Sequence, residues 1–268
     1  MKKIKAIFFD IDGTLLNFDH TWPSSLFETL KAVKANGVKL FIATGRAYQD
    51  IPLIKKEMPE GIMDGWIAFN GQYCITEDGV EVRSVTIPND EAQKAINYLI
   101  QQDIGTFIEE RDQTFITKMS DDLPDNYKYF ADLFEADFYN DKRLKHHPVY
   151  QLVPYIYRHQ KDIEARMFSM MPGYKPARWN DLCVDVIPKS GGKDVGIDAM
   201  LEYFNIPLEN TMAIGDGEND IDMIMHAGIG VAMGNAPERV KAIADYVTDD
   251  IDRDGIYKAM KHFKLLDQ

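Results

Sequence analysis

The sequence predicts an α/β protein: a Rossmann-like, doubly wound parallel sheet core, interrupted by an inserted α+β domain with an antiparallel sheet. Three observations predict this class. Apolar strand patterns alternate with amphipathic helix patterns near both ends of the chain. Hairpin patterns replace that alternation in the middle. A length of 268 residues suits one large domain or two modest domains.

The first third of the chain alternates strand and helix. A short apolar run bounded by turn residues predicts a buried strand, and apolar residues three and four apart predict a helix. On these grounds we expect, in order, strand 4–10, helix 24–35, strand 38–43, helix 47–57 and strand 66–69. This order is typical of a parallel sheet with helices on its faces.

The alternation stops near Gln72, where the middle of the chain begins. We expect hairpin 72–76/80–85, helix 90–102, hairpin 105–109/113–118, helix 125–135, a strand-like stretch 146–156, helix 160–170 and strands 177–180 and 183–187. We place the inserted domain at residues 85–187. The aromatic side chains around its second helix are expected in its core: Tyr127, Tyr129, Phe130, Phe134 and Phe138.

The alternating pattern returns after Pro188. We expect helix 192–204, strand 211–214, helix 220–226, strand 229–232, helix 238–244, strand 246–248 and helix 255–263. Residues 1–84 and 188–268 are therefore predicted to form the parallel core.

Composition and charge narrow the function classes. The net charge of −13 argues against non-specific binding of nucleic acid or of an anionic membrane, which requires a basic surface. It leaves room for a small anionic substrate, because a bound metal can outweigh the global field. We predict buried thiols for Cys74 and Cys183, which fits a reducing compartment. With no signal peptide or membrane span in the pattern, we expect a cytoplasmic protein, and a monomer is compatible with the sequence.

The first strand runs directly into two carboxylates, Asp10 and Asp12. Like charges at the end of a buried strand repel each other and lose solvent unless a cation offsets them. Because the ligands on offer are oxygens, the stretch predicts a hard cation, with Mg²⁺ preferred.

Polar residues recur where the predicted parallel strands end, and that edge is where ligands bind in such sheets. They are Asp10, Asp12, Thr44, Asn70 and Asp216, with Asn219 and Asp220 just beyond. Lys193 opens a helix, where its positive charge is unfavourable unless an anion or Asp220 lies opposite. Carboxylates for a metal, a hydroxyl, an amide and one cation together suit a phosphoryl group.

These residues resemble the four motifs of the haloacid dehalogenase (HAD) superfamily. The motifs are, in order, Asp10-Ile11-Asp12-Gly13-Thr14, Thr44-Gly45-Arg46, Lys193, and Gly215-Asp216-Gly217-Glu218-Asn219-Asp220. The large insert between the second and third motifs, with Asn70-Gly71 after the third strand, resembles the Cof-type branch, which carries a C2 (type IIB) cap. The resemblance covers essentially the whole chain.

The resemblance implies a role for each motif residue. Asp10 would be the nucleophile that forms an aspartyl-phosphate, and Asp12 the general acid and base. Mg²⁺ would be held by the Asp10 carboxylate, the Asp12 backbone carbonyl and Asp216, while Asp220 would orient Lys193 or a metal-bound water. The implied substrate-binding set is Thr44, Gly45, Arg46, Asn70, Lys193 and Asn219, with Thr44 and Lys193 on the phosphoryl oxygens.

The function that follows is Mg²⁺-dependent hydrolysis of a small phosphorylated metabolite, with sugar phosphates as the leading class through resemblance only. Two alternatives remain open: a receiver-like phosphoaspartate signalling module and a phosphosugar mutase of the same superfamily. The sequence names neither the substrate nor the cap residues that would select it. Lys189 is the alternative to Lys193 for holding the phosphoryl group.

Overall fold

The structure, a computed structural model, describes residues 3–119, 123–133, 136–140 and 147–266. The chain divides into two compact units. The core unit comprises Met1–Arg46, Asp50–Ser84 and Gly191–Gln268, and the insert unit comprises Ala47–Gln49 and Val85–Ser190. The prediction that these units act as catalytic core and cap stays a prediction.

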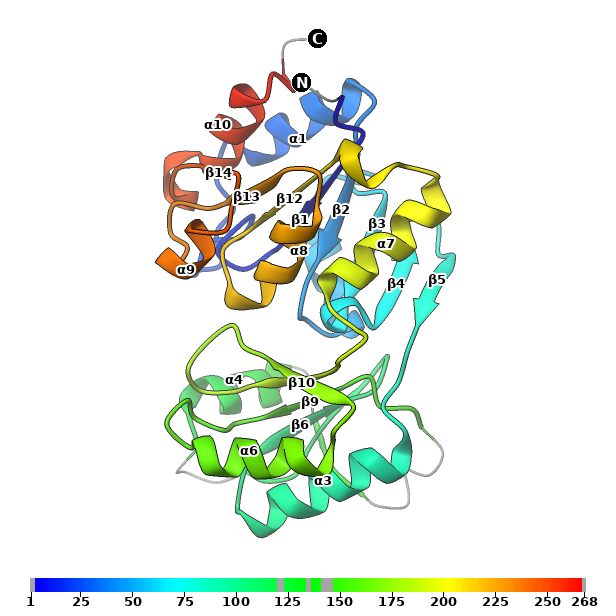
Figure 1. Cartoon of the computed structure of the whole chain (residues 1–268), viewed down its shortest axis with the longest axis vertical. Coiled ribbons are helices and arrows are strands. Elements are labelled where there is room, and N and C mark those ends of the chain that lie inside the picture. Colours follow the sequence, from blue (N-terminus) through cyan, green and yellow to red (C-terminus); the bar gives the residue numbers. More distant parts are fainter. Residues whose placement is uncertain (1–2, 120–122, 134–135, 141–146, 267–268) are drawn as a thin grey trace. The chain divides into compact units, whose positions relative to one another are not determined.

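The core unit is built on an eight-stranded sheet with the order β14-β13-β12-β1-β2-β3-β4-β5 (Figure 1). Its strands are β1 (Ala6–Phe9), β2 (Lys39–Ala43), β3 (Gly65–Ala68), β4 (Tyr73–Thr76), β5 (Glu81–Ser84), β12 (Thr211–Gly215), β13 (Gly230–Ala232) and β14 (Tyr246–Val247). The strands from β14 to β3 pair in parallel. All four residues of β1 are buried, as expected of a central parallel strand covered on both faces.

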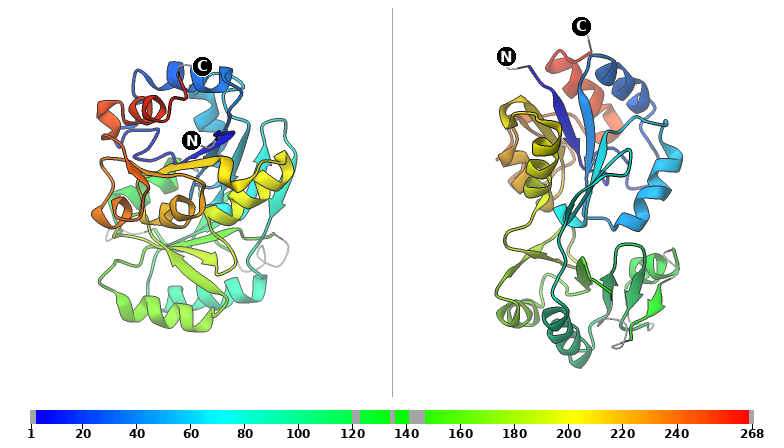
Figure 2. Two further views of the ribbon diagram at one scale, coloured as in Figure 1. Left: turned by 45° about the horizontal axis from the view of Figure 1, so that its top comes forward. Right: turned by 90° about the vertical axis from the view of Figure 1, so that its right-hand side faces the viewer.

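Helices cover both faces of this sheet. They are α1 (Leu26–Ala35), α2 (Ile51–Glu57), α7 (Lys193–Phe204), α8 (Ile221–His226), α9 (Glu238–Lys241) and α10 (Gly255–His262). Helix α1 packs against α10, and α7 packs against α8. Figure 2 shows the first pair on one side of the sheet and the second pair on the other. This arrangement confirms the predicted α/β class and leaves the carboxyl ends of the parallel strands together at one edge.

The hairpin predicted after Gln72 belongs to the core sheet. Strand β4 pairs antiparallel with β3 and with β5, so the hairpin extends the parallel sheet at its edge. The change from parallel to antiparallel pairing therefore comes before the chain leaves the core unit at Ser84. Mixed sheets of this kind are common when an antiparallel edge is added to a parallel core.

The insert unit has a six-stranded sheet with the order β10-β11-β9-β6-β7-β8. Its strands are β6 (Thr106–Glu109), β7 (Thr114–Ile116), β8 (Asp137–Phe138), β9 (Gln151–Pro154), β10 (Tyr174–Ala177) and β11 (Asp185–Pro188). The pairs are antiparallel, as predicted, except that the two-residue strand β8 runs parallel to β7. Its helices are α3 (Asn89–Gln101), α4 (Asp125–Leu133) and α6 (Lys161–Met170). Within the described part of the chain, no helix has the length and apolar character to cross a membrane.

Two predictions for this unit were wrong in detail. The strand predicted at 177–180 lies earlier, at Tyr174–Ala177. The reason is a turn at Asn180, whose side-chain oxygen accepts hydrogen bonds from the backbone N–H groups of Leu182 and Cys183, at 2.8 and 3.0 Å. Of the predicted core aromatics, Tyr127 is buried, whereas Tyr129 and Phe138 are exposed. The side chains of Phe130 and Phe134 lie outside the described residues.

Candidate active site

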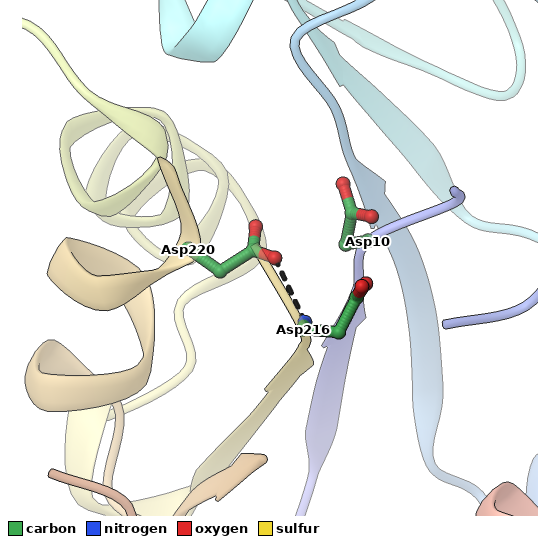
Figure 3. Close-up of side chains that lie close together, drawn as sticks. All are labelled: Asp10, Asp216 and Asp220. Carbon is green, nitrogen blue, oxygen red and sulfur yellow. Dashed lines mark hydrogen bonds between the residues drawn. The ribbon is translucent and has the colours of Figure 1, made fainter. Parts of the chain in front are cut away.

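Asp10 and Asp216 follow two neighbouring parallel strands at the point where each strand ends. The register pairs Phe9 of β1 with Ile214 of β12, and the Asp10 N–H donates to the Ile214 carbonyl at 2.9 Å. This register places the two carboxylates side by side, and both are buried. Figure 3 shows them together with Asp220, which follows the same β12 strand four residues after Asp216.

Lys193 joins the first carboxylate to the third. Its Nζ donates to Asp10 Oδ1 and to Asp220 Oδ1, both at 2.6 Å, and its side chain is fully buried. Because α7 begins at Lys193, the positive charge lies where the helix dipole is unfavourable to it. The two carboxylates opposite supply the negative charge that the sequence led us to expect there.

The second oxygen of Asp220 fixes the loop that carries Asp216. Asp220 Oδ2 accepts the backbone N–H groups of Asp216 and Gly217, at 3.0 and 2.8 Å. Asp220 is completely buried, so these bonds and the bond to Lys193 satisfy a carboxylate that has no access to water. Asp220 thus holds the end of β12 and the amine of Lys193 in one arrangement.

The electrostatics of this group favour a further cation. Burial, with repulsion from Asp220 next, raises the pKa of Asp10 well above its usual range. The same two causes raise the pKa of Asp216 to about 7. Burial by itself lowers the pKa of Lys193, but Asp10 and Asp220 outweigh it and raise that pKa. Three carboxylates against one ammonium leave two negative charges when all are ionised, which a divalent cation would offset.

The donor set fits such a cation. Asp10, Asp216 and Asp220 each offer an oxygen, and these oxygens lie within 4.8 Å of one another. Carboxylate oxygens are the ligands that Mg²⁺ prefers, and a partly hydrated Mg²⁺ needs only one or two of them. The Asp12 carboxylate does not belong to this cluster, so its predicted part in metal binding rests on its backbone carbonyl alone.

The affinity of the cluster for Mg²⁺ is expected to fall as the pH drops below about 7. Protons compete with the cation for Asp10 and Asp216, because the pKa values of both carboxyls are raised. For each proton that Mg²⁺ must displace, the binding constant falls by up to about tenfold for each unit by which the pH is lowered. Calorimetric titration with Mg²⁺ at pH 6 and pH 8 checks this, with a buffer-only titration as control. Equal dissociation constants at the two pH values would contradict the prediction.

Asp12 lies in a different environment. Its two carboxylate oxygens accept hydrogen bonds from one edge of the Arg46 guanidinium, from Nε at 2.8 Å and from Nη2 at 2.5 Å. The Asp12 side chain is 41% exposed, in contrast to the buried Asp10. Asp12 is therefore a solvent-accessible carboxylate held by a bidentate ion pair, two residues after the buried Asp10 in the sequence.

The remaining predicted residues form two smaller groups. Thr44 is buried at the end of β2, and its Oγ1 accepts the backbone N–H of Arg46 at 3.0 Å, with Gly45 between them. Asn70 has a left-handed backbone (φ 52°) after β3, and its Oδ1 accepts Asn219 Nδ2 at 3.4 Å. The four polar strand ends of the prediction thus lie along β12, β1, β2 and β3, which are adjacent in the sheet.

Lys189, the alternative to Lys193, belongs to the other unit. It is exposed, belongs to the insert unit, and follows strand β11. Its backbone N–H donates to the Gly173 carbonyl at 2.8 Å. Lys193, which lies in the core unit, is the lysine whose amine contacts Asp10.

Two further side chains contact Asp216, and neither has a role in the sequence-based prediction. Thr14 Oγ1 donates to Asp216 Oδ1 at 2.9 Å, and Asn235 Nδ2 lies 3.4 Å from Asp216 Oδ2. Thr14 stands inside the first motif, and Asn235 follows the end of strand β13. Applying the strand-end rule to β13 as well would have singled out Asn235.

Comparison with known proteins agrees with this geometry. A family model described as haloacid dehalogenase-like hydrolase matches residues 7–260. The solved structure of the HAD subclass IIB sugar phosphatase BT4131 is 37% identical, with a TM-score of 0.85 over 97% of this chain and 99% of that one.

Two proteins of Bacillus subtilis (strain 168) also match over nearly their full lengths. One of them, named "Putative phosphatase YkrA", is 32% identical over 272 residues, covering 98% of each chain. YitU, named 5-amino-6-(5-phospho-D-ribitylamino)uracil phosphatase, is 26% identical over 266 residues, covering 96% of each. Since the family model spans almost the whole chain and includes all four motifs, this protein belongs to the haloacid dehalogenase-like hydrolase family.

Proposed function

We propose that this HAD-family phosphatase is an Mg²⁺-dependent phosphohydrolase that acts on a small phosphorylated metabolite through an aspartyl-phosphate on Asp10. One observation carries the proposal. The buried Asp10 carboxylate accepts a hydrogen bond from Lys193 and lies beside Asp216, at the carboxyl edge of a parallel sheet. A carboxylate so placed can act as a covalent nucleophile next to groups that offset the charge of a phosphoryl group.

In the first half of the reaction, a carboxylate oxygen of Asp10 forms a bond to phosphorus as the bond between phosphorus and the leaving oxygen breaks. The leaving oxygen takes a proton from the Asp12 carboxyl group and departs as an alcohol. Such in-line transfer depends mainly on positioning and on charge stabilisation. Lys193 and the Thr44 hydroxyl would donate hydrogen bonds to the phosphoryl oxygens.

In the second half, the Asp12 carboxylate accepts a proton from water while the water oxygen attacks phosphorus. The bond between phosphorus and Asp10 breaks, and inorganic phosphate leaves with the Asp10 carboxylate restored. Each oxygen of Asp12 accepts one hydrogen bond from Arg46 in this structure, which leaves one lone pair on each oxygen for the leaving oxygen or for water.

Asp10, the Asp12 carbonyl and Asp216 would hold Mg²⁺, which would supply positive charge that offsets the phosphoryl oxygens. Asp220 keeps Lys193 charged and aimed at Asp10. Burial of these groups strengthens each interaction, because little water is present to screen it.

The relatives support a polyhydroxylated substrate. BT4131 is described as a sugar phosphatase, and the substrate named for YitU carries its phosphate on a ribityl chain. Both descriptions share a phosphate monoester on a short chain of hydroxylated carbons. We propose this class here, with the insert unit acting as a cap that contacts the leaving group and selects among such substrates.

The test is a panel of phosphorylated metabolites assayed for release of inorganic phosphate. We expect hydrolysis of one or more sugar or polyol phosphates in the presence of Mg²⁺, loss of that activity with EDTA, and recovery when excess Mg²⁺ is added back. A nucleotide and a phosphorylated peptide serve as contrasting substrates in the same panel.

Each contrary outcome has a distinct meaning. Phosphate release that persists in EDTA would refute the metal dependence. Isomerised sugar phosphate without free phosphate would favour a mutase over a hydrolase. Phosphoprotein that persists for minutes after a phosphoryl donor is removed would favour the signalling alternative.

A further inference from the structure

Asn235 ties together three parts of the core unit that are far apart in the sequence. Its Nδ2 donates to the Gly13 carbonyl at 2.9 Å and lies 3.4 Å from Asp216 Oδ2. Its Oδ1 accepts the backbone N–H of Ile251 at 3.0 Å. The loop after β1, the loop after β12 and the loop after β14 therefore meet at a single half-buried amide.

The bond to Ile251 fixes the orientation of this amide. Because Oδ1 is engaged by a backbone donor, Nδ2 must face the opposite way, toward Gly13 and Asp216. An amide with both ends engaged has little freedom to rotate, so its donor is held ready in place.

Asp216 is held from both sides as a result. Its Oδ1 accepts the Thr14 hydroxyl at 2.9 Å, and its Oδ2 faces the Asn235 amide. The loop approaches this carboxylate closely: Gly13 has a left-handed backbone (φ 80°), and a β-carbon added there would lie only 2.4 Å from Asp216 Oδ2. A small shift of this loop would therefore move the carboxylate.

We infer that Asn235 is a positioning residue for the divalent-cation site. It holds the loop that follows Asp12 and the carboxylate of Asp216 in register, so that the oxygens of Asp10 and Asp216 face the same point. This inference rests on the proposed function, because it takes Asp10, the Asp12 backbone carbonyl and Asp216 to hold the Mg²⁺ ion. Outer partners that orient ligands in this way typically account for about tenfold or more in metal affinity.

Asn235→Ala is expected to weaken Mg²⁺ binding about tenfold, measured by calorimetry on the full-length protein. Activity should fall at limiting Mg²⁺ and return toward the wild-type kcat when Mg²⁺ is raised, because the ligands themselves are intact. The rise in Tm that Mg²⁺ produces in the wild type should be smaller in the variant at the same Mg²⁺ concentration.

Asn36→Ala is the matched control. Asn36 is also half-buried, lies in the same unit, and donates its Nδ2 to a backbone carbonyl, that of Leu265, at 2.9 Å. Losing this bond should lower the Tm that is measured in the absence of Mg²⁺. The Mg²⁺ affinity and the Mg²⁺-dependent rise in Tm should stay at the wild-type values.

The outcomes separate this inference from the proposed function. If wild-type protein binds no Mg²⁺, the proposed metal site fails and the inference fails with it. If the wild type binds Mg²⁺ and Asn235→Ala binds it equally well, only the inference is overturned. The same holds if high Mg²⁺ does not restore kcat, because Asn235 would then act on something other than cation binding.

Discussion

Asp10→Asn is expected to abolish release of inorganic phosphate, by at least about 10³-fold, from any substrate that the wild-type protein hydrolyses. An amide is too weak a nucleophile to attack phosphorus, and the substitution removes the carboxylate oxygen that Lys193 and the end of β1 position. Asparagine has nearly the same shape as aspartate, so the loss should be one of chemistry and not of folding.

The fold can be checked separately in the same variant. Removing the Asp10 charge leaves Lys193 paired with Asp220. It also removes the cost of burying that charge beside Asp220, the two causes that raise the pKa of Asp10, so we expect a Tm within a few degrees of wild type. Acid-quenched wild-type protein should carry a phosphoryl group on Asp10 during turnover, and Asp10→Asn should carry none. Asp252→Asn, which alters an exposed carboxylate of the same unit, is the control for substitution as such.

Turnover at the wild-type rate by Asp10→Asn, in a preparation free of other phosphatases, would refute covalent catalysis by this residue. A variant that fails to fold would be recognised by its circular dichroism. In that case trapping of the phosphoryl group in wild-type protein, followed by mapping of the modified peptide, decides the question independently.

Much of the site was predictable because it follows from backbone topology. Parallel strands bring their carboxyl ends to one edge, so the order of strands and polar residues was enough to gather Asp10, Thr44, Asn70 and Asp216. Lys193 was predictable from the cost of a cation at a helix N-terminus, which requires an anion opposite.

The contacts that depend on side-chain direction were not predictable. The place of Arg46 near the substrate stays a prediction, and the sequence did not indicate the pairing of its guanidinium with both oxygens of Asp12. That pairing depends on how two loops turn, and sequence patterns do not report it. The strand-end rule, applied to β13, indicates the position of Asn235, but it does not indicate the three partners of this side chain, because they come from separate loops.

The fold, like the site, has parts that the sequence predicts and parts that it does not. Periodicity found the strands and helices of the core unit, because their buried faces impose a regular spacing. It misplaced β10, where a side-chain turn at Asn180 competes with strand pairing, and it did not indicate the two-residue strand β8, which is too short to have a period.

Lys193→Met is expected to destabilise the protein by about 3–5 kcal/mol at neutral pH, which is the usual cost of removing one partner from a buried charge pair. Methionine fills similar space but leaves Asp10 and Asp220 facing each other without the ammonium that both contact at 2.6 Å. Chemical denaturation of both proteins without Mg²⁺ measures this loss. Activity should be lost as well, since the ammonium that would donate to the phosphoryl oxygens is gone.

The loss should depend on pH in a defined direction. The pKa of Asp10 is already raised in the folded protein by burial and by repulsion from Asp220, and removal of Lys193 removes an opposing effect that lowers it. A folded state with raised carboxyl pKa values binds more protons than the unfolded chain, whose carboxyls titrate near about 4. The destabilisation should therefore be larger at mildly alkaline pH, where Lys193 is still charged in the wild type, and shrink as the pH falls toward about 4.

Lys189→Met provides the matched control, because it makes the same substitution four residues earlier. Lys189 is exposed, so its loss should change stability by no more than about 0.5 kcal/mol and leave activity near wild type. If Lys189→Met instead lost activity while Lys193→Met kept it, the lysine that holds the phosphoryl group would be Lys189. If Lys193→Met were as stable as wild type at neutral pH, the carboxylates around it would have to be protonated there. The cluster would then lack the negative charge on which cation binding depends.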